Sequence, residues 1–250
     1  VVMPTVFDDK YTVAVFDENL VLKQAFNNTT GLSSTNAFSA YTSGHLLWVG
    51  LDNCISKIEI GNAFYHFGKE SGLAGAINDI YKFDGKMYVG TGNGLFRESF
   101  DENGLPSFER IYTYATQKIT TFKVPNSDKK ILLAGTALNV IELKNGDVKL
   151  KEDGSARDEI EHIDCSVLFQ SRLHPEYLYI GTREGLVWEK YKPANGKNWQ
   201  HIDHILEGIE VTSIEEDSKG NIWCATSKGV VKMSPDGKNI TTYDEESGIP

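Results

Sequence analysis

The sequence predicts an all-β fold made of about six repeated sheets, and three observations support this. A four-residue phrase that ends in Gly-Thr or a close variant recurs along the chain. An apolar pair stands upstream of each copy, and a Gly or Asn followed by an apolar residue stands downstream of most copies. Repetition at a period of about 40–50 residues indicates units that bury their apolar faces on their neighbours.

The recurring phrase predicts the second strand of each unit. Its small residue stands at positions 50, 90, 135, 181 and 225, so successive copies are 40, 45, 46 and 44 residues apart. A small residue lets adjacent sheets approach closely, and the residue two places earlier, which is aromatic in four copies, shares its face and fills the gap. The copies are Trp48–Leu51, Tyr88–Thr91, Leu133–Thr136, Tyr179–Thr182 and Trp223–Thr226.

The flanking residues predict the other three strands. The upstream apolar pair marks a first strand, and the downstream Gly or Asn takes the positive φ that a hairpin turn needs before a third strand. A β-rich segment then closes several units, which gives strands about eleven residues apart, as in an antiparallel meander. The first-strand pairs are Phe38 and Tyr41, Ile77 and Ile80, Ile119 and Phe122, Val167 and Phe169, and Val211 and Ile214, and the closing segments are Phe64–Phe67, Phe108–Tyr114, Trp199–Ile205 and Ile240–Tyr243.

A sixth, degenerate copy is expected near the start of the chain, where Val13–Phe16 fits a second strand and Asn19 with Leu20 fits its turn. Four-stranded antiparallel units arranged radially make a β-propeller. We therefore expect one β-propeller domain over residues 1–250, and Ser155–Glu161 is the best candidate for a helix. The predicted blades span approximately residues 1–32, 33–73, 74–115, 116–162, 163–208 and 209–250.

A Gly-Leu or Gly-Ile step marks several unit boundaries, at Gly31-Leu32, Gly72-Leu73 and Gly248-Ile249. The sequence thus stops where a further blade would begin. Two interpretations are open: the six blades close into a ring, or they belong to a longer array.

Composition restricts the classes of partner. There are 25 Lys and Arg residues against 35 Asp and Glu residues, a net charge of −10, which disfavours nucleic acid or an anionic membrane as a partner. No long apolar run is present, so direct membrane insertion is not expected. Cys54, Cys165 and Cys224 cannot all pair within the chain, and Cys224 replaces the Val or Ile of other copies as a small buried residue.

No pattern typical of a catalytic or metal centre is present. The six histidines show no His-x-His or His-Glu-x-x-His spacing, and His201 and His204, three residues apart on a predicted strand, point to opposite faces. The glycine-rich segment Gly90–Gly94 lies in a predicted hairpin with no helix after it, which disfavours a phosphate site. Acidic turns such as Glu152–Gly154 hold too few carboxylates for calcium. We expect no enzyme activity, no cofactor and no metal.

The turns between second and third strands supply the candidate ligand-binding residues. Their chemistry varies while their flanks stay constant, as is common for binding surfaces built on a rigid scaffold. An Arg-Glu pair could grip a sugar acid or a hydroxyl pair, with Asn side chains as neutral donors. Each residue could instead be an ordinary turn residue at the surface. The candidates are Asp52, Asn53, Asn93, Arg183, Glu184 and Lys228.

Residues 211–250 resemble the two-component regulator propeller repeat, through Ile214, the Gly220–Trp223 step and the closing Gly248-Ile249. Ile77–Phe96 is similar to the same repeat. The resemblance implies a non-catalytic, periplasmic sensor region of a hybrid histidine kinase that responds to carbohydrate. It also implies an oligosaccharide ligand, and as partners the other propeller or receptor domains of the same protein or a second copy in a homodimer.

Two alternatives remain. A propeller hydrolase or lyase, similar to lactonases or streptogramin lyases, would need a metal or a His/Glu group on the axis, where Asp79, Glu215 and Glu216 are the obvious acids. A protein-interaction propeller of the WD-repeat kind would carry Gly-His and Trp-Asp dipeptides, and the chain has an isolated Gly44-His45.

Overall fold

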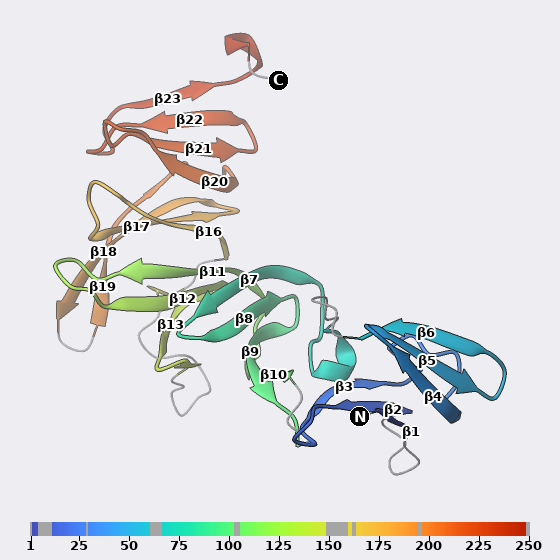
Figure 1. The fold of residues 1–250 in the computed structure, drawn as a ribbon. Coiled ribbons are helices and arrows are strands. Elements are labelled where there is room, and N and C mark those ends of the chain that lie inside the picture. Colours follow the sequence, from blue (N-terminus) through green and yellow to red (C-terminus); the bar gives the residue numbers. More distant parts are fainter. Residues whose placement is uncertain are drawn as a thin grey trace. The chain divides into compact units, whose positions relative to one another are not determined.

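The computed structural model describes residues 2–4, 12–28, 30–60, 67–102, 106–148, 160–161, 164–194 and 197–248. These residues form six antiparallel sheets, and the chain completes each sheet before it begins the next (Figure 1). The helical residues described are two single 3-10 turns, η1 (Lys69–Ser71) and η2 (Glu245–Ser247). The prediction of an all-β fold with about six repeated sheets is therefore confirmed.

We number the sheets in chain order. Sheet 1 contains β1 (Val2–Pro4), β2 (Val13–Phe16) and β3 (Leu22–Phe26); sheet 2 contains β4 (Ala37–Ser43), β5 (Leu46–Leu51) and β6 (Ile55–Glu59); sheet 3 contains β7 (Ile77–Phe83), β8 (Lys86–Thr91), β9 (Gly94–Phe100) and β10 (Pro106–Tyr112). Sheet 4 contains β11 (Thr116–Lys123), β12 (Lys130–Thr136), β13 (Asn139–Lys144), β14 (Asp147–Val148) and β15 (Ile160–Glu161); sheet 5 contains β16 (Cys165–Gln170), β17 (Tyr177–Thr182), β18 (Gly185–Ala194) and β19 (Lys197–Ile205); sheet 6 contains β20 (Val211–Glu216), β21 (Ile222–Thr226), β22 (Gly229–Met233) and β23 (Ile240–Tyr243).

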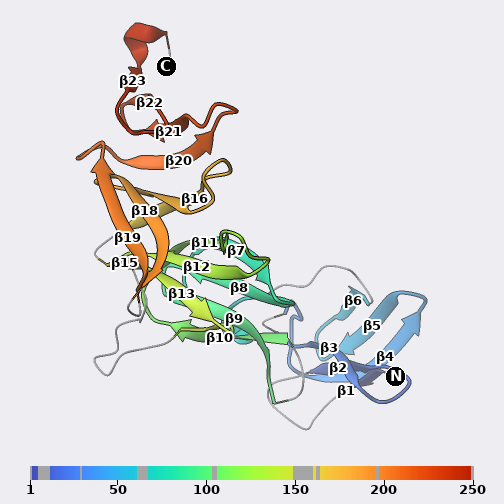
Figure 2. The ribbon, with the colours of Figure 1, turned by 90° about the vertical axis from the view of Figure 1, so that its left-hand side faces the viewer.

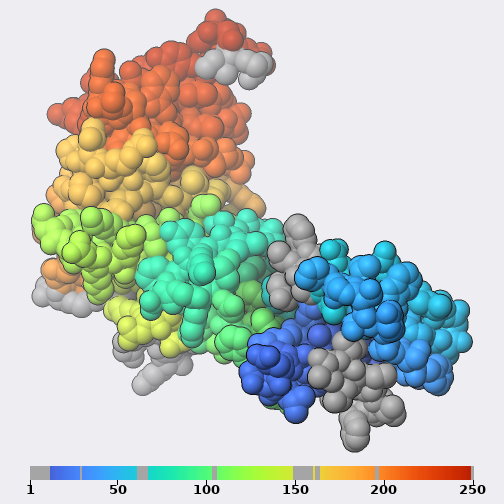
Figure 3. All heavy atoms as spheres, in the orientation of Figure 1, coloured from blue at the N-terminus to red at the C-terminus, as the bar shows by residue number. Residues whose placement is uncertain are grey.

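The chain divides into two compact units. One unit comprises Val1–Leu73 and Glu98–Glu109, and it holds sheets 1 and 2. The other comprises Ala74–Arg97 and Arg110–Pro250, and it holds sheets 4 to 6 and most of sheet 3. Within this second unit the successive sheets follow one another in contiguous bands, from turquoise to red (Figures 2 and 3). No helix in the described ranges is long and apolar enough to cross a membrane.

The apolar core consists of clusters between consecutive sheets. One cluster joins sheets 1 and 2, and three more join sheet 3 to 4, sheet 4 to 5 and sheet 5 to 6. Tyr88 and Tyr179, from the recurring phrase, are each 2% exposed and fill these gaps as predicted. Trp48 differs: it is 40% exposed, with the Lys57 ammonium 5.4 Å from its ring centroid. A single sheet cannot bury these apolar side chains by itself. Their burial between neighbouring sheets therefore stabilises the array.

The small residue of the phrase allows this close packing. A Cβ on Gly181 would lie 2.5 Å from Val167 Cγ1 and 2.7 Å from the carbonyl oxygen of Val211, the first residue of the next sheet. A Cβ on Gly135 would lie 2.2 Å from the sulfur of Cys165, which also begins the next sheet. Side chains at these positions would therefore push successive sheets apart.

Sheet 1 corrects the prediction for Val13–Phe16. This strand is the middle strand of three, and not a second strand followed by a hairpin to a third and a fourth. The strand after it, β3, leads directly into the Gly31-Leu32 boundary step, as β23 leads into Gly248. The three strands of sheet 1 thus correspond to the second, third and fourth strands of a complete sheet.

Several closing strands are confirmed, namely β10, β19 and β23. Predicted residues 64–66 and 155–159 lie outside the described residues, and Ile160–Glu161 is a strand, not part of a helix. At the boundaries, Leu32 and Leu73 are buried, and their backbone N–H groups donate to Asn27 and Gly68 carbonyls at 3.0 Å. The boundary step therefore returns the chain to the core at the start of the next sheet.

Candidate functional site

A polar cavity of about 440 Å³ lies at the starts of the first strands in the second unit. Four different sheets contribute to it, and six of its seven lining residues carry polar or charged side chains. The cavity is lined by Ile77, Asn78, Gln117, Asp164, Ser166, Arg183 and Glu210.

A repeated β-bulge explains which side chains reach this cavity. In five sheets the first strand shifts register opposite the Gly-Thr step of the second strand, so one extra residue has no partner. A bulge bends its strand and re-aims the side chain of the extra residue. Three of the five extra residues line the cavity: Asn78, Gln117 and Ser166. The extra residues are Phe38, Asn78, Gln117, Ser166 and Thr212.

Burial confirms two of the predicted first-strand pairs and corrects two others. Ile119 with Phe122 and Val211 with Ile214 are buried, whereas Ile77 and Ile80 are 48% and 57% exposed. Phe38 and Tyr41 are 74% and 68% exposed, so they do not form the inward pair of sheet 2. In sheets 4 to 6, two buried residues of the first strand are three apart and bracket the bulge, as in Cys165 with Leu168 and Val211 with Ile214. In a regular strand, residues that face the same side are two positions apart. A spacing of three between two apolar residues therefore indicates a bulge between them, and this spacing is the sequence signal for the extra residues that line the cavity.

Arg183 and Asp164 form the charged edge of the cavity. Arg183 Nε lies 3.2 Å from Asp164 Oδ2, and the Arg183 side chain is 70% exposed. Such an exposed ion pair contributes little stability, and it leaves guanidinium donors for a ligand. On β7, Asn78 Nδ2 donates to the Thr116 carbonyl oxygen at 3.0 Å, and this hydrogen bond fixes the orientation of the Asn78 side-chain amide. The cavity thus offers amide, hydroxyl, carboxylate and guanidinium groups in a defined arrangement.

The turn that carries Arg183 is held by Thr182. Its hydroxyl donates to the Gly185 carbonyl oxygen at 2.9 Å and accepts from the Glu184 N–H at 3.0 Å. The threonine of the recurring phrase forms the same pair of contacts in sheets 3, 4 and 6. In sheet 2, Leu51 takes this position, and its N–H donates to the Cys54 carbonyl oxygen instead. The Gly-Thr step is predictable from the sequence, whereas the role of its hydroxyl is not.

The six predicted ligand residues all lie in the predicted turns, and the structure brings one of them to the cavity. Arg183 lines it, whereas Asn93, Glu184 and Lys228 are exposed in their turns outside the lining. Asp52 and Asn53 belong to the other compact unit, where Asp52 Oδ2 accepts from Asn36 Nδ2 at 3.4 Å. Their role in binding stays a prediction.

The acids considered for a catalytic role make structural contacts. Asp79 Oδ2 accepts from the Ile119 N–H at 2.7 Å and lies 3.1 Å from Lys118 Nζ, so it ties sheet 3 to sheet 4. The buried Glu216 accepts from the Ser171 hydroxyl and the Arg172 N–H, both at 2.6 Å, and thereby ties sheet 6 to sheet 5. Within the described ranges, no group of three or more His, Cys, Asp or Glu residues could hold a metal ion.

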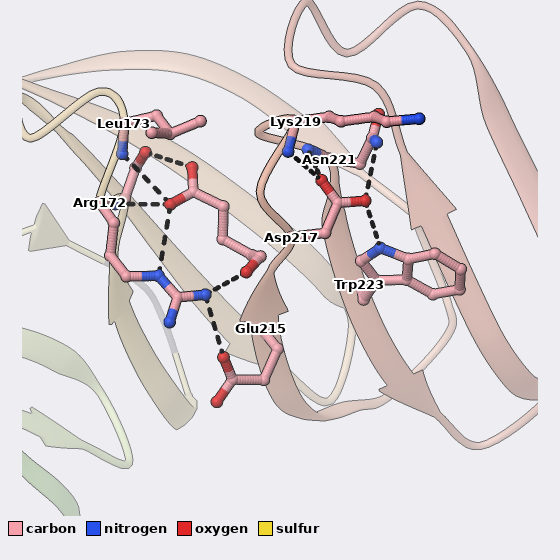
Figure 4. A network of polar contacts seen from close by, with 9 residues as sticks. Arg172, Leu173, Glu215, Asp217, Lys219, Asn221 and Trp223 are labelled. Atoms are coloured by element: carbon pink, nitrogen blue, oxygen red, sulfur yellow. Dashed lines mark hydrogen bonds and ion pairs between the residues drawn. The ribbon is translucent and has the colours of Figure 1, made fainter.

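Asp217 organises the β20–β21 turn, and the sequence analysis missed this role. Its carboxylate accepts from the Lys219 and Asn221 N–H groups at 2.9 and 3.0 Å (Figure 4). It also accepts from Asn221 Nδ2 at 2.8 Å and Trp223 Nε1 at 3.0 Å. The Asn221 side chain above all, and then Trp223, hold the pKa of Asp217 well below its ordinary value. The Asp, Asn and Trp of this repeat are therefore one hydrogen-bonded unit.

Comparisons with known proteins agree with this fold. Residues 205–228 match the family model described as "Two component regulator propeller". A curated relative, histidine kinase P4 of Formosa agariphila, is 24% identical over 252 residues, which cover 93% of this chain and 18% of the relative. Among solved structures, the extracellular domain of a hybrid two-component system from B. thetaiotaomicron aligns with a TM-score of 0.63 and 20% identity, over 96% of this chain and 33% of that one.

Virginiamycin B lyase of Staphylococcus aureus aligns with a TM-score of 0.43 and 12% identity, over 83% of this chain and 69% of the lyase. The chain spans about one fifth of the length of the histidine kinase and about one third of that of the extracellular domain. The family match includes β20, β21 and the turn that Asp217 organises. The chain therefore carries the two-component regulator propeller repeat that its sequence resembles, within an array of antiparallel sheets.

Proposed function

We propose that the chain is a non-catalytic, ligand-binding part of the periplasmic sensor region of a two-component signalling receptor. The match at residues 205–228 and the similarity to a histidine kinase and to an extracellular receptor domain support this proposal. Because the chain covers 18% and 33% of these relatives, its proposed partners are the other domains of the same receptor or a second copy of it.

The proposed ligand is an oligosaccharide, bound in the polar cavity. The observation that carries this proposal is the repeated bulge, which directs Asn78, Gln117 and Ser166 from three sheets into one cavity. Amide and hydroxyl groups both donate and accept hydrogen bonds, as sugar hydroxyls require, and Arg183 can bind a carboxylate or a pair of hydroxyls. The volume of about 440 Å³ lies in the range of small-molecule sites, about 300–1,000 Å³.

Isothermal titration against a panel of neutral and acidic oligosaccharides tests the proposal. We expect at least one member to bind, and Gln117→Ala and Arg183→Ala each to weaken binding at least fivefold. Thr212→Ala is the matched control, because Thr212 is also a bulge residue but does not line the cavity. Equal losses in the control, or silence across the panel, would contradict a saccharide site here and leave a structural or dimerising role.

A further inference from the structure

A second cavity, of about 640 Å³, lies at the other ends of the same strands. The polar cavity lies where β7 and β11 begin, whereas this one lies at the β7–β8 and β11–β12 turns, where those strands end. Its lining comes from sheets 3, 4 and 5 and belongs entirely to the second unit. The two cavities share no lining residue, so a ligand of one does not require the other.

The second cavity is basic, although the chain is acidic. Four lysines line it, against the two acids Asp84 and Glu142. The lysines enter from three separate turns or strand ends, so their charges surround the cavity and do not follow a single strand. In a chain with a net charge of −10, such a local excess of cations is the feature that attracts an anion. The lysines are Lys86, Lys129, Lys130 and Lys144.

One of the two acids is already bound to neutral donors. Glu142 is 2% exposed, and its carboxylate accepts from Asn198 Nδ2 at 2.9 and 3.1 Å and from Trp199 Nε1 at 3.2 Å. These N–H donors stabilise a carboxylate that would otherwise be costly to bury. Glu142 thus acts as a structural link between sheets 4 and 5 at the base of the cavity.

An aromatic wall of fixed orientation completes the cavity. The ring of Tyr191 lies 5.3 Å from that of Phe122 and 5.3 Å from that of Trp199, centroid to centroid. A tyrosine hydroxyl keeps its proton at neutral pH, and burial raises the pKa of Tyr191 further, so this hydroxyl can donate a hydrogen bond to an anionic ligand. A planar or ring-shaped group can therefore rest beside Tyr191 while its anionic group faces the lysines.

We propose that this second cavity binds an anionic group, a carboxylate or a sulfate. It lies at the ends of the strands opposite the polar cavity. The anionic group contacts Lys129 and Lys130, and Tyr191 donates a hydrogen bond to it. A free inorganic anion and an acidic sugar both carry this chemistry. The site stands independently of the oligosaccharide proposal, because its residues are different.

Binding measurements on the whole 250-residue chain test this site with three probes. The probes are trigalacturonate, its fully methyl-esterified form, and inorganic sulfate. We expect trigalacturonate to bind at least tenfold more tightly than its ester, and the variant Lys129→Gln/Lys130→Gln to weaken it at least tenfold. The control Lys219→Gln/Lys238→Gln changes the net charge equally at exposed lysines outside the cavity, and we expect a change of less than twofold.

Sulfate distinguishes the two sources of the anion. Binding of sulfate that the Lys129→Gln/Lys130→Gln variant abolishes assigns the site to free anions, and binding of trigalacturonate alone assigns it to acidic sugars. The site is overturned if no anion binds, if acid and ester bind equally, or if both double variants lose the same affinity. Gln117→Ala keeps the two proposals separate, because it alters the polar cavity and should leave lysine-dependent binding unchanged.

Discussion

Thr182 shows how a single hydroxyl positions the turn that carries Arg183. It donates to Gly185 and accepts from Glu184, and it is almost fully buried. Valine has the same shape but can form neither bond, so Thr182→Val should remove both hydrogen bonds and cost about 1–3 kcal/mol of unfolding free energy. Denaturant unfolding measures this cost. Thr241→Val, at an exposed position on β23, is the control and should change stability by less than about 0.5 kcal/mol.

Asp217 makes stability depend on pH. Its pKa is lowered on folding, so its contribution is fully present above the unfolded pKa of about 4 and is lost as pH falls through the lower folded pKa. We expect Asp217→Asn to lower the Tm at pH 7, and its difference from the native chain to shrink steadily as the pH falls below 4.

Thermal unfolding followed by circular dichroism at pH 7, 4 and 2.5 measures this difference. Asp236→Asn is the matched comparison. The Asp236 carboxylate accepts two hydrogen bonds, from the Ser234 hydroxyl and the Lys238 N–H, whereas the Asp217 carboxylate accepts four. A pH-independent difference between Asp217→Asn and the native chain would show that shape, and not charge, is what the position requires.

At the scale of the sheet, the second strand sets the distance to the next sheet. A valine at position 181 would collide with Val167 and with the backbone of Val211, and neither the backbone nor a packed β-branched side chain can move freely. Gly181→Val should therefore cost roughly 1–3 kcal/mol of unfolding free energy through overpacking. Chemical denaturation measures it.

Gly92→Ala is the control for Gly181→Val, because it also replaces a glycine but at a position with open space. A Cβ at position 92 would meet no atom nearer than Ala76 N at 4.0 Å, so this substitution should be neutral or stabilise by up to about 1 kcal/mol. Equal effects of the two changes would mean that loss of glycine itself, and not contact between sheets, determines the cost.

The repeated second strand was predictable because its signal is local: an aromatic or large residue, a small residue and a threonine at constant spacing. The cavity was not, because a bulge adds one residue without changing composition. The spacing of three between Ile77 and Ile80 departs from strand alternation, and the structure places the extra Asn78 between them, but this spacing alone does not show which side chains line a cavity. Sheet 1 was misassigned for a related reason, since Val13–Phe16 suits any inner strand and its position depends on which strands pair with it.

At the scale of the whole molecule, the three thiols report on opening between sheets. Cys165 and Cys224 are buried in the clusters that join sheet 4 to 5 and sheet 5 to 6, whereas Cys54 is exposed. Burial raises the pKa of Cys224 to about 12 and raises that of Cys165 still further, which suppresses the reactive thiolate of both.

A thiol-specific reagent at pH 8 should therefore modify one cysteine rapidly in the folded chain and all three in denaturant. Cys54→Ser identifies the fast site, because it should remove the rapid phase and leave the other two thiols protected. Rapid reaction of two or more thiols under native conditions would contradict tight burial between the sheets.

The bulge residues have a consequence for how such proteins diversify. An extra residue on a first strand contributes no pairing to its ladder, so exchanging Gln117 or Ser166 changes the lining of the polar cavity with little effect on the sheets. Packing depends on other residues, the glycines and aromatics of the second strands. Substitution at these few positions can thus change the chemistry of the polar cavity while the folding energetics stay nearly constant.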